Sequence, residues 1–327
     1  MSELEPPPPD RRAGPPRFAV RLAPPDLGPW LAGNVLPGVW SFAAPEPGPH
    51  VALVSLMHGN EIGGAIVLER WLRAGLRPRR GRLTLIFANL DAFARFDPSD
   101  PTASRYVDED MNRVWCLRQL DGPRRTAELR RARALRPVLD SADIVLDLHS
   151  MLWPSDPLVL TGEAPQAADL ALGLGLPSLV VADAGHAAGR RLIDYARFQE
   201  PGRAAILLEA GAHWEPSTTA VMEQVAAQLL RRHGLAVDGA PLPPAAEDGA
   251  AAPVLARVTR TVTANTTAFG FLRPYRGGEV VERRNTVIAL DGETEIRTPH
   301  DDCLLVMPSL RTPRGHTAVR LAQFVAR

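Results

Sequence analysis

The sequence predicts an α/β protein with a mixed, largely parallel sheet and helices on both faces, followed by a small C-terminal all-β module. Two observations predict this fold. Short runs that are apolar on both faces alternate with helical segments through the first two thirds of the chain, and the later part contains short strands separated by tight turns. A length of 327 residues suits one large domain and one smaller domain.

The expected strands of the α/β part are brief and lack a polar face, which is typical of strands covered on both sides. Helical segments lie between several of them, and this alternation favours parallel neighbours in the sheet. The expected strands are 51–57, 83–88, 144–148, 158–160, 178–181 and 205–208. The expected helices are 62–74, 123–139, 166–173 and 216–233.

Changes in composition divide the chain. Residues 1–17 are proline-rich and charged and are expected to form a disordered tail, and residues 18–236 are expected to form the α/β domain. Residues 237–253, rich in Pro, Ala, Gly and acidic side chains, are expected to be a linker. Residues 254–327 are expected to form a small β-barrel or sandwich. Its expected strands are 254–263, 280–281, 286–290, 293–297 and 304–307.

The charge balance argues against some partners. Lys+Arg and Asp+Glu both total 37, so no net charge attracts the chain to nucleic acid or to an anionic membrane. Cys116 and Cys303 lie far apart and indicate no disulfide framework. We see no apolar run suited to a signal peptide or a membrane span. The expectation is a cytoplasmic protein with a small-molecule partner, and a homo-oligomer is compatible with it.

The sharpest local pattern is Met57-His58-Gly59-Asn60-Glu61, where a buried strand ends and a helix begins. Open α/β sheets place their sites at this end of the strands. An imidazole and a carboxylate three residues apart in such a turn can converge on one cation, and this pair suits zinc. His and Glu at this spacing also occur as a surface pair, so the motif needs a third ligand.

His149 can supply that ligand because the strand 144–148 runs directly into it. If this strand and the strand before His58 are parallel neighbours, both histidines emerge at the same edge of the sheet. Two histidines and one carboxylate leave an open position for water, as in catalytic zinc sites. The alternative is a hydrogen-bonded core histidine. Asp147 could orient a ligand or could be a solvated or capping carboxylate.

Another strand ends in Glu209, which could move a proton between water and a leaving amine. Its alternative role is to cap the following segment, and His213 nearby is expected to be structural. A polar loop, 105–113, lies between the first and second candidate metal segments and contains Arg105 and Arg113. Arginine forks bind carboxylates through paired hydrogen bonds, although such a loop can also be only solvated and salt-bridged.

Four motifs in this order resemble the succinylglutamate desuccinylase and aspartoacylase family of the zinc carboxypeptidase-like superfamily. They are His58-Gly-Asn-Glu61, the 105–113 segment, Asp147-Leu-His149 and Glu209-Ala-Gly211. The resemblance spans roughly residues 50–327. It implies a zinc-dependent amidohydrolase that removes an acetyl or succinyl group from a small N-acyl amino acid by metal-activated water.

The resemblance also implies a role for each matching residue. One Zn²⁺ per chain would be held by His58, Glu61 and His149, with Glu209 as the catalytic acid and base. Arg105 would polarise the scissile carbonyl. Asn112 and Arg113 would grip a carboxylate of the substrate.

The sequence departs from the aspartoacylases at the substrate's second carboxylate. Aspartoacylases place a Tyr from the C-terminal domain there, together with an Arg shortly before the catalytic Glu. The segment 313–317 contains no Tyr, and Arg197 and Arg203 only approximate the Arg. His316 could replace the Tyr or could lie in an exposed turn. The acyl group and the amino acid therefore stay open.

Two other functions need similar residues. A zinc carboxypeptidase acting on short peptides uses the same types of ligand and an Arg for the terminal carboxylate. The short interval from Glu61 to His149 and the β module favour the deacylase, because a domain over the site would exclude long peptides. A non-catalytic protein that binds a metal or an amino acid could share the fold, but it would not need Glu209.

Overall fold

The computed structural model describes residues 18–185, 188–236, 241–245 and 252–325. The expected tail at 1–17 and most of the expected linker at 237–253 lie outside these residues. The chain divides into two compact units. The first consists of Val20–Met151 and Pro157–Leu255, and the second consists of Leu152–Asp156 and Ala256–Arg327 together with residues at the N-terminus.

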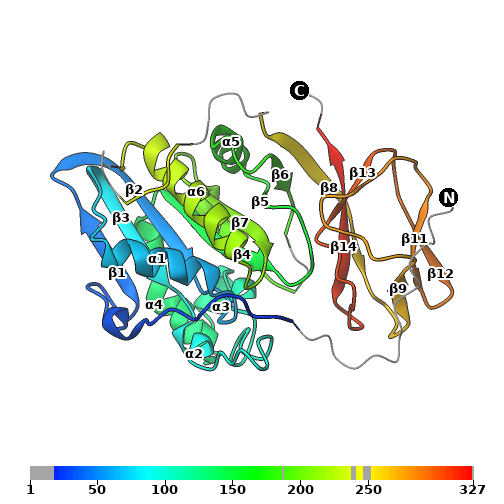
Figure 1. Cartoon of the computed structure of the whole chain (residues 1–327), viewed down its shortest axis with the longest axis horizontal. Coiled ribbons are helices and arrows are strands. Elements are labelled where there is room, and N and C mark those ends of the chain that lie inside the picture. Colours follow the sequence, from blue (N-terminus) through cyan, green and yellow to red (C-terminus); the bar gives the residue numbers. More distant parts are fainter. Residues whose placement is uncertain (1–17, 186–187, 237–240, 246–251, 326–327) are drawn as a thin grey trace. The chain divides into compact units, whose positions relative to one another are not determined.

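The first unit contains a mixed sheet in the order β1-β3-β2-β4-β7-β5-β6 (Figure 1). The central strands β3, β2, β4 and β7 are parallel, whereas β1 is antiparallel to β3 and β5 is antiparallel to β7. A largely parallel sheet is therefore confirmed. The strands are β1 Val39–Ala43, β2 Glu46–Ser55, β3 Arg80–Phe87, β4 Ile144–Met151, β5 Leu158–Thr161, β6 Leu179–Ala182 and β7 Ala204–Ala212.

Helices cover both faces of this sheet, as expected. Figure 1 shows α1 and α6 packed side by side on one face and α4 on the other. Thr126 caps α4 by accepting the Leu129 N–H at 3.2 Å, and prolines occupy the first turns of α5 and α6. The helices are α1 Gly63–Arg73, α2 Leu90–Phe93, α3 Leu117–Leu120, α4 Ala127–Ser141, α5 Pro165–Gly173 and α6 Pro216–Arg232.

Alternation along the strands separates the core from the polar side chains. Leu146 and Leu148 of β4 and Leu208 of β7 belong to the core beneath α1 and α6. Because successive side chains of a strand point to opposite faces, Asp147, His149 and Glu209 all point to the other face. Both strands therefore present their ionisable groups on the same side of the sheet.

The outer edge of the sheet is closed at β1. The Asn34 side chain accepts the Ser41 N–H at 2.7 Å and donates to the Ser41 carbonyl at 2.9 Å. The Val39 carbonyl accepts the N–H groups of Asn34 and Val35. These bonds occupy backbone groups that an edge strand otherwise leaves open.

The second unit is all-β, which confirms the expected module. The strands β8, β14, β13 and β10 pair antiparallel in this order, and β12, β11 and β9 form a separate antiparallel sheet. Gly292, at φ 63°, makes the tight turn between β11 and β12. The strands are β8 Val254–Thr263, β9 Phe269–Phe271, β10 Val280–Val281, β11 Val287–Asp291, β12 Thr294–Arg297, β13 Cys303–Val306 and β14 Thr317–Phe324.

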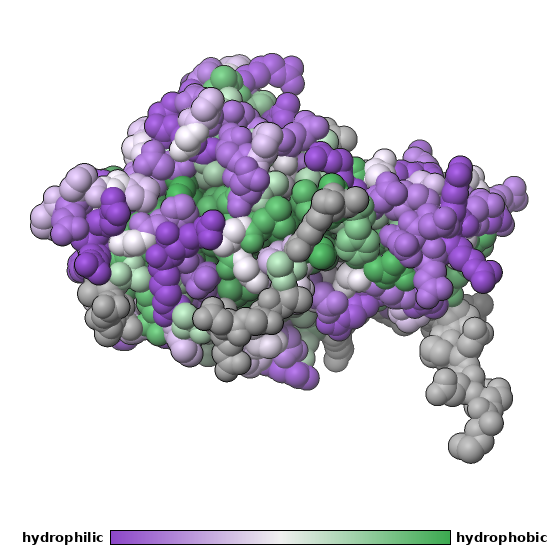
Figure 2. Space-filling view, turned by 90° about the horizontal axis from the view of Figure 1, so that it is seen from above, coloured by the Kyte–Doolittle hydropathy of each residue, from purple (hydrophilic) through white to green (hydrophobic). Residues whose placement is uncertain are grey.

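Hydrophilic residues cover much of the face seen in Figure 2. Among the described residues, no helix combines the length and the apolar character that crossing a bilayer requires.

Candidate metal centre

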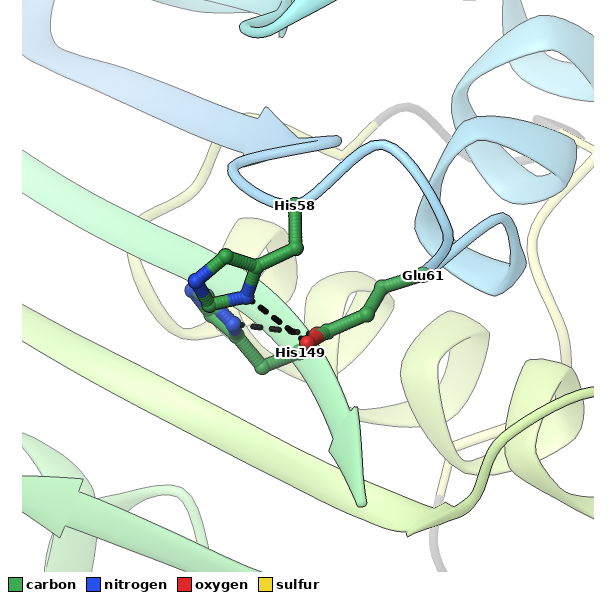
Figure 3. Close-up of side chains that lie close together, drawn as sticks. All are labelled: His58, Glu61 and His149. Carbon is green, nitrogen blue, oxygen red and sulfur yellow. Dashed lines mark hydrogen bonds and ion pairs between the residues drawn. The ribbon is translucent and has the colours of Figure 1, made fainter. Parts of the chain in front are cut away.

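The three candidate ligands come together in the first unit. His58 and Glu61 lie on the loop between β2 and α1, and His149 lies near the end of β4, which pairs parallel with β2. The Glu61 carboxylate lies between the two imidazoles, with Oε1 2.7 Å from His58 Nδ1 and Oε2 3.0 Å from His149 Nδ1 (Figure 3). The candidate ligand atoms all lie within 4.8 Å of one another, and all three residues are buried.

The backbone of the His58–Glu61 loop is tightly constrained. Leu56, just after β2, has a left-handed conformation at φ 56°, which is unusual for a residue with a bulky side chain. The Gly59 N–H donates to the Arg105 carbonyl at 3.1 Å. A Cβ at Gly59 would lie 2.4 Å from the Ala92 carbonyl carbon and 2.6 Å from the Ser104 carbonyl oxygen. Only glycine fits where the loop touches these two backbones.

Each imidazole has a carboxylate at both of its nitrogens. His149 Nε2 lies 2.9 Å from Asp147 Oδ2 without forming a hydrogen bond, and His58 Nε2 lies 2.9 Å from both Asp110 Oδ1 and Arg105 Nη2. A neutral imidazole carries one N–H and can donate to only one of its two carboxylates. The other contact needs a second proton or a cation.

A single divalent cation satisfies this arrangement best. Two buried imidazolium rings with centroids 5.0 Å apart would repel each other at a high desolvation cost. One ion held by both imidazoles and by Glu61 would remove that conflict, and the outer carboxylates would face the other side of each ring, as they commonly do for metal-binding histidines. Two histidines and one carboxylate suit zinc. These residues could therefore hold a zinc ion.

The two outer carboxylates differ in their surroundings. Asp147 is fully buried, so it is not the solvated carboxylate that was its alternative role. Burial raises the pKa of Asp110, but His58 and Arg105 outweigh this effect and hold the pKa well below its ordinary value. The sequence does not identify Asp110 as part of the site, because nothing local shows that it reaches His58, 52 residues away.

Glu209 lies directly beside His149. The register of β4 and β7 pairs these two residues, and paired residues on neighbouring strands share a face. The Glu209 side chain is 6% exposed. A carboxylate is thus placed next to a candidate ligand without belonging to the ligand set.

The loop at 105–113 reaches the same site. Arg105 donates to Glu61 Oε1 at 3.3 Å and to Asp110 Oδ2 at 3.1 Å, and its side chain is 37% exposed. Asn112 Oδ1 accepts the Leu192 N–H at 2.8 Å, which leaves the Asn112 amide nitrogen as its side-chain donor. Arg113 Nη2 lies 4.0 Å from Asp110 Oδ2. Two guanidinium groups and an amide therefore lie around the site.

Glu128 of α4 holds this loop, and sequence reasoning did not identify it. Its side chain is fully buried and accepts the N–H groups of Val107, Asp108 and Glu109 at 2.6, 3.0 and 3.3 Å. It also accepts from Asn89 at 3.1 Å. In the sequence, an acid in the first turn of a helix indicates only a favourable helix start.

His213 and Trp214 follow β7 and also approach the site. His213 Nδ1 and Ser150 Oγ are hydrogen-bonded at 2.6 Å, and the Ser150 N–H donates to Glu61 Oε2 at 3.0 Å. Burial lowers the pKa of His213 to about 4, so the ring is neutral near pH 7. Trp214 Nε1 donates to the Asn60 carbonyl at 2.9 Å.

Arg197 and Arg203 lie away from this site. Arg197 Nε donates to the Asp140 carbonyl at 3.0 Å, and Arg203 donates to the carbonyls of Asp140 and Ala142. Arg203 immediately precedes β7. The first residue of β7 lies five positions before Glu209, so Arg203 and Glu209 are at least about 16 Å apart along the strand. Neither arginine therefore takes the place of the Arg seen in aspartoacylases. His316 lies in an exposed turn of the second unit.

Part of this chain matches a family model and several curated proteins. The family model for the succinylglutamate desuccinylase/aspartoacylase catalytic domain matches residues 47–232. Mouse (Mus musculus) aspartoacylase is 30% identical over 119 residues, which cover 34% of this chain and 36% of that protein. A human N-acyl-aromatic-L-amino acid amidohydrolase (carboxylate-forming) is 32% identical over 116 residues, covering 32% of this chain and 34% of that protein. The chain thus spans about a third of the length of these curated relatives.

Solved structures show the same fold over most of the chain. The succinylglutamate desuccinylase of Vibrio cholerae matches with a TM-score of 0.67 and 18% identity, covering 89% of this chain and 86% of that one. A succinylglutamate desuccinylase/aspartoacylase of Rhodobacter sphaeroides matches with a TM-score of 0.65 and 19% identity, covering 88% and 89%. Since the family model matches more than half of the sequence, the chain belongs to the succinylglutamate desuccinylase/aspartoacylase family.

Proposed function

We propose that this protein is a zinc-dependent amidohydrolase that removes an acetyl or succinyl group from a small N-acyl amino acid. The observation that carries the proposal is the buried His58, Glu61 and His149 set, backed by two carboxylates and with Glu209 on the neighbouring strand. This combination supplies a metal site together with a separate group for proton transfer.

Each polar residue has a role in this reaction. Bound zinc would act as a Lewis acid toward water and the scissile carbonyl. The Glu209 carboxylate takes a proton from the attacking water and delivers it to the leaving nitrogen as the C–N bond breaks. Arg105 stabilises the negative charge that develops on the carbonyl oxygen. Asn112 and Arg113 bind a substrate carboxylate, so that the products are a carboxylic acid and a free amino acid.

The names of the relatives support the reaction class and leave the amino acid open. The name of the mouse relative refers to aspartate, and that of the human relative refers to aromatic amino acids. Both names describe the removal of an acyl group. We therefore propose the reaction that they share.

The first test is metal content, followed by amine release from N-acetyl and N-succinyl amino acids with acidic, aromatic and aliphatic side chains. We expect about one zinc per chain and release that a chelator abolishes. Protein that is inactive even after zinc is restored would point to a binding protein. Release of amino acids from peptides with a free N-terminus would point to a carboxypeptidase.

Glu209→Gln tests the assignment of the acid and base. The amide cannot accept a proton, so we expect amine release to fall about 10²- to 10⁴-fold, with zinc content unchanged. Glu223→Gln is the matched control, because the Glu223 carboxylate accepts hydrogen bonds from Arg70 and Trp71, outside the site. Loss of zinc from the Glu209 variant would mean that Glu209 serves the metal instead.

A further inference from the structure

Two adjacent residues after β7 contact both segments that carry the candidate ligands. Trp214 reaches the His58–Glu61 loop, and His213 reaches the end of β4, where His149 lies. We call this pair the His213–Trp214 clamp. The proposed reaction uses neither side chain, so its function needs a separate explanation.

The first contact of the clamp is made by an indole N–H. Trp214 Nε1 donates at 2.9 Å to the carbonyl of Asn60, which lies between the ligands His58 and Glu61. The Trp214 side chain is buried. A bond to the backbone between two ligands restrains both of them, because the loop is short and its Glu61 N–H already donates to the His58 carbonyl at 3.1 Å.

The second contact is made by an imidazole. His213 Nδ1 and Ser150 Oγ lie 2.6 Å apart. The backbone N–H of His213 also donates to the Met151 carbonyl at 2.8 Å. Ser150 directly follows His149, and its own N–H donates to Glu61 Oε2 at 3.0 Å. His213 therefore restrains Ser150, which contacts the candidate ligand Glu61 and directly follows the candidate ligand His149.

The backbone of the clamp is in a conformation that Trp rarely adopts. Trp214 has φ 59°, in the left-handed region that favours glycine. Packing and hydrogen bonding must offset this strain. The ring contacts of Trp214 with His213 and Phe96, at centroid distances of 5.0 and 6.4 Å, and its bond to Asn60 provide such an offset. Glycine would relieve the strain but would lose these contacts.

We propose that His213 and Trp214 are positioning residues that hold the His58–Glu61 loop and the end of β4 at the separation that zinc binding requires. This inference rests on the proposed metal site. It assigns the clamp an effect on metal affinity, acting through Asn60 and Ser150 and without contact between the clamp and the metal.

The test measures zinc binding by the full chain without any substrate. Trp214→Phe removes the indole N–H and keeps an aromatic ring, and Ser150→Ala removes the hydroxyl and keeps the backbone bond to Glu61. Each is expected to weaken zinc binding about 10- to 100-fold, measured by competition with a chromophoric chelator. Trp115→Phe is the matched control, because Trp115 is fully buried and its Nε1 has no partner among the described residues.

Thermal unfolding of the metal-free variants identifies any that do not fold. If Trp214→Phe fails to fold, Ser150→Ala decides the question. Variants that fold and bind zinc as tightly as the unsubstituted chain would overturn the clamp and leave the metal site standing. An unsubstituted chain that binds no zinc would overturn the proposed function and the clamp with it.

Discussion

At the scale of single residues, the site contains more carboxylates than guanidinium groups. Carboxylates outnumber the guanidinium groups near them by two, and most of them are buried, where unbalanced charge is costly. A divalent cation would balance this excess. The groups counted are the carboxylates of Glu61, Asp110, Asp147 and Glu209 and the guanidinium groups of Arg105 and Arg113.

His213 makes stability depend on pH. Its pKa is lowered to about 4 in the folded protein, against an ordinary value of 6.5. Between these values the unfolded chain binds a proton that the folded chain does not, so stability falls as the pH drops from 6.5 to 4. The full shift is worth roughly 3 kcal/mol. His213→Asn, which does not titrate, should show a shallower decline in urea unfolding of the metal-free protein.

The difference between the two slopes isolates His213, because both proteins keep their other histidines. His50 and His233 also have lowered pKa values, chiefly through burial, and contribute equally to both curves. If stability declined equally with falling pH in both proteins, protonation of His213 would not destabilise the folded state.

Residues at strand ends could be predicted, and their outer partners could not. The metal-ligand candidates and Glu209 lie at or just after the ends of predicted strands, so they meet at one edge of the sheet if those strands are parallel neighbours. Residues such as Ser150 gain their importance only from tertiary contacts across many positions of sequence. No spacing rule in a single sequence reports such contacts.

At the scale of elements, the His58–Glu61 loop tolerates no side chain at its second position. Gly59→Ala would drive a Cβ into the backbones of Ala92 and Ser104, which cannot move as a flexible side chain would. We expect loss of most bound zinc and a lower melting temperature, measured by metal analysis and calorimetry. The control is Gly63→Ala, whose nearest neighbour is the flexible Met222 side chain. Full zinc content in the Gly59 variant would contradict this packing.

The 105–113 loop depends on α4 for its shape. Glu128→Gln replaces one acceptor oxygen with an NH₂ group that faces backbone N–H donors, so at least one of them loses its partner. Such a loss costs about 1–3 kcal/mol, and we expect kcat/KM for amine release to fall at least about tenfold. The Glu223→Gln control should leave both stability and turnover nearly unchanged. An active Glu128 variant would mean that the loop holds its own shape.

The elements that could be predicted are those with a uniform environment. The central strand β4 is buried along its whole length and begins with the apolar run Ile144–Leu146. The edge strand β1 is only partly buried, and β14 carries Arg320 within its apolar run. These two strands were not expected, since their patterns depend on neighbours far away in the sequence.

At the scale of the whole molecule, the fold class could be predicted but the order of strands could not. β5 pairs antiparallel with β7, yet its sequence is as apolar as that of a strand in a parallel pair. The sequence pattern therefore does not reveal its direction. The departure from a purely parallel sheet arises from how connections cross the sheet, which hydrophobic patterns do not encode.

Removal of the metal should destabilise the first unit selectively, because all three candidate ligands belong to it. A ligand that binds only the folded state adds about 2.7 kcal/mol when its free concentration is 100 times its Kd. A chelator should therefore lower the melting temperature that tryptophan fluorescence reports, since five of the six tryptophans belong to this unit. An unchanged transition at saturating chelator would count against a structural contribution from the metal.

The Asn34 side chain that occupies the backbone of Ser41 has a consequence for self-association. A second chain approaching β1 would find no open ladder to extend and would first have to displace this amide. Continuous intermolecular sheets, the usual route to fibrils through an exposed strand, are therefore blocked at this margin. One asparagine thus protects the β1 edge of the sheet from pairing with a second chain.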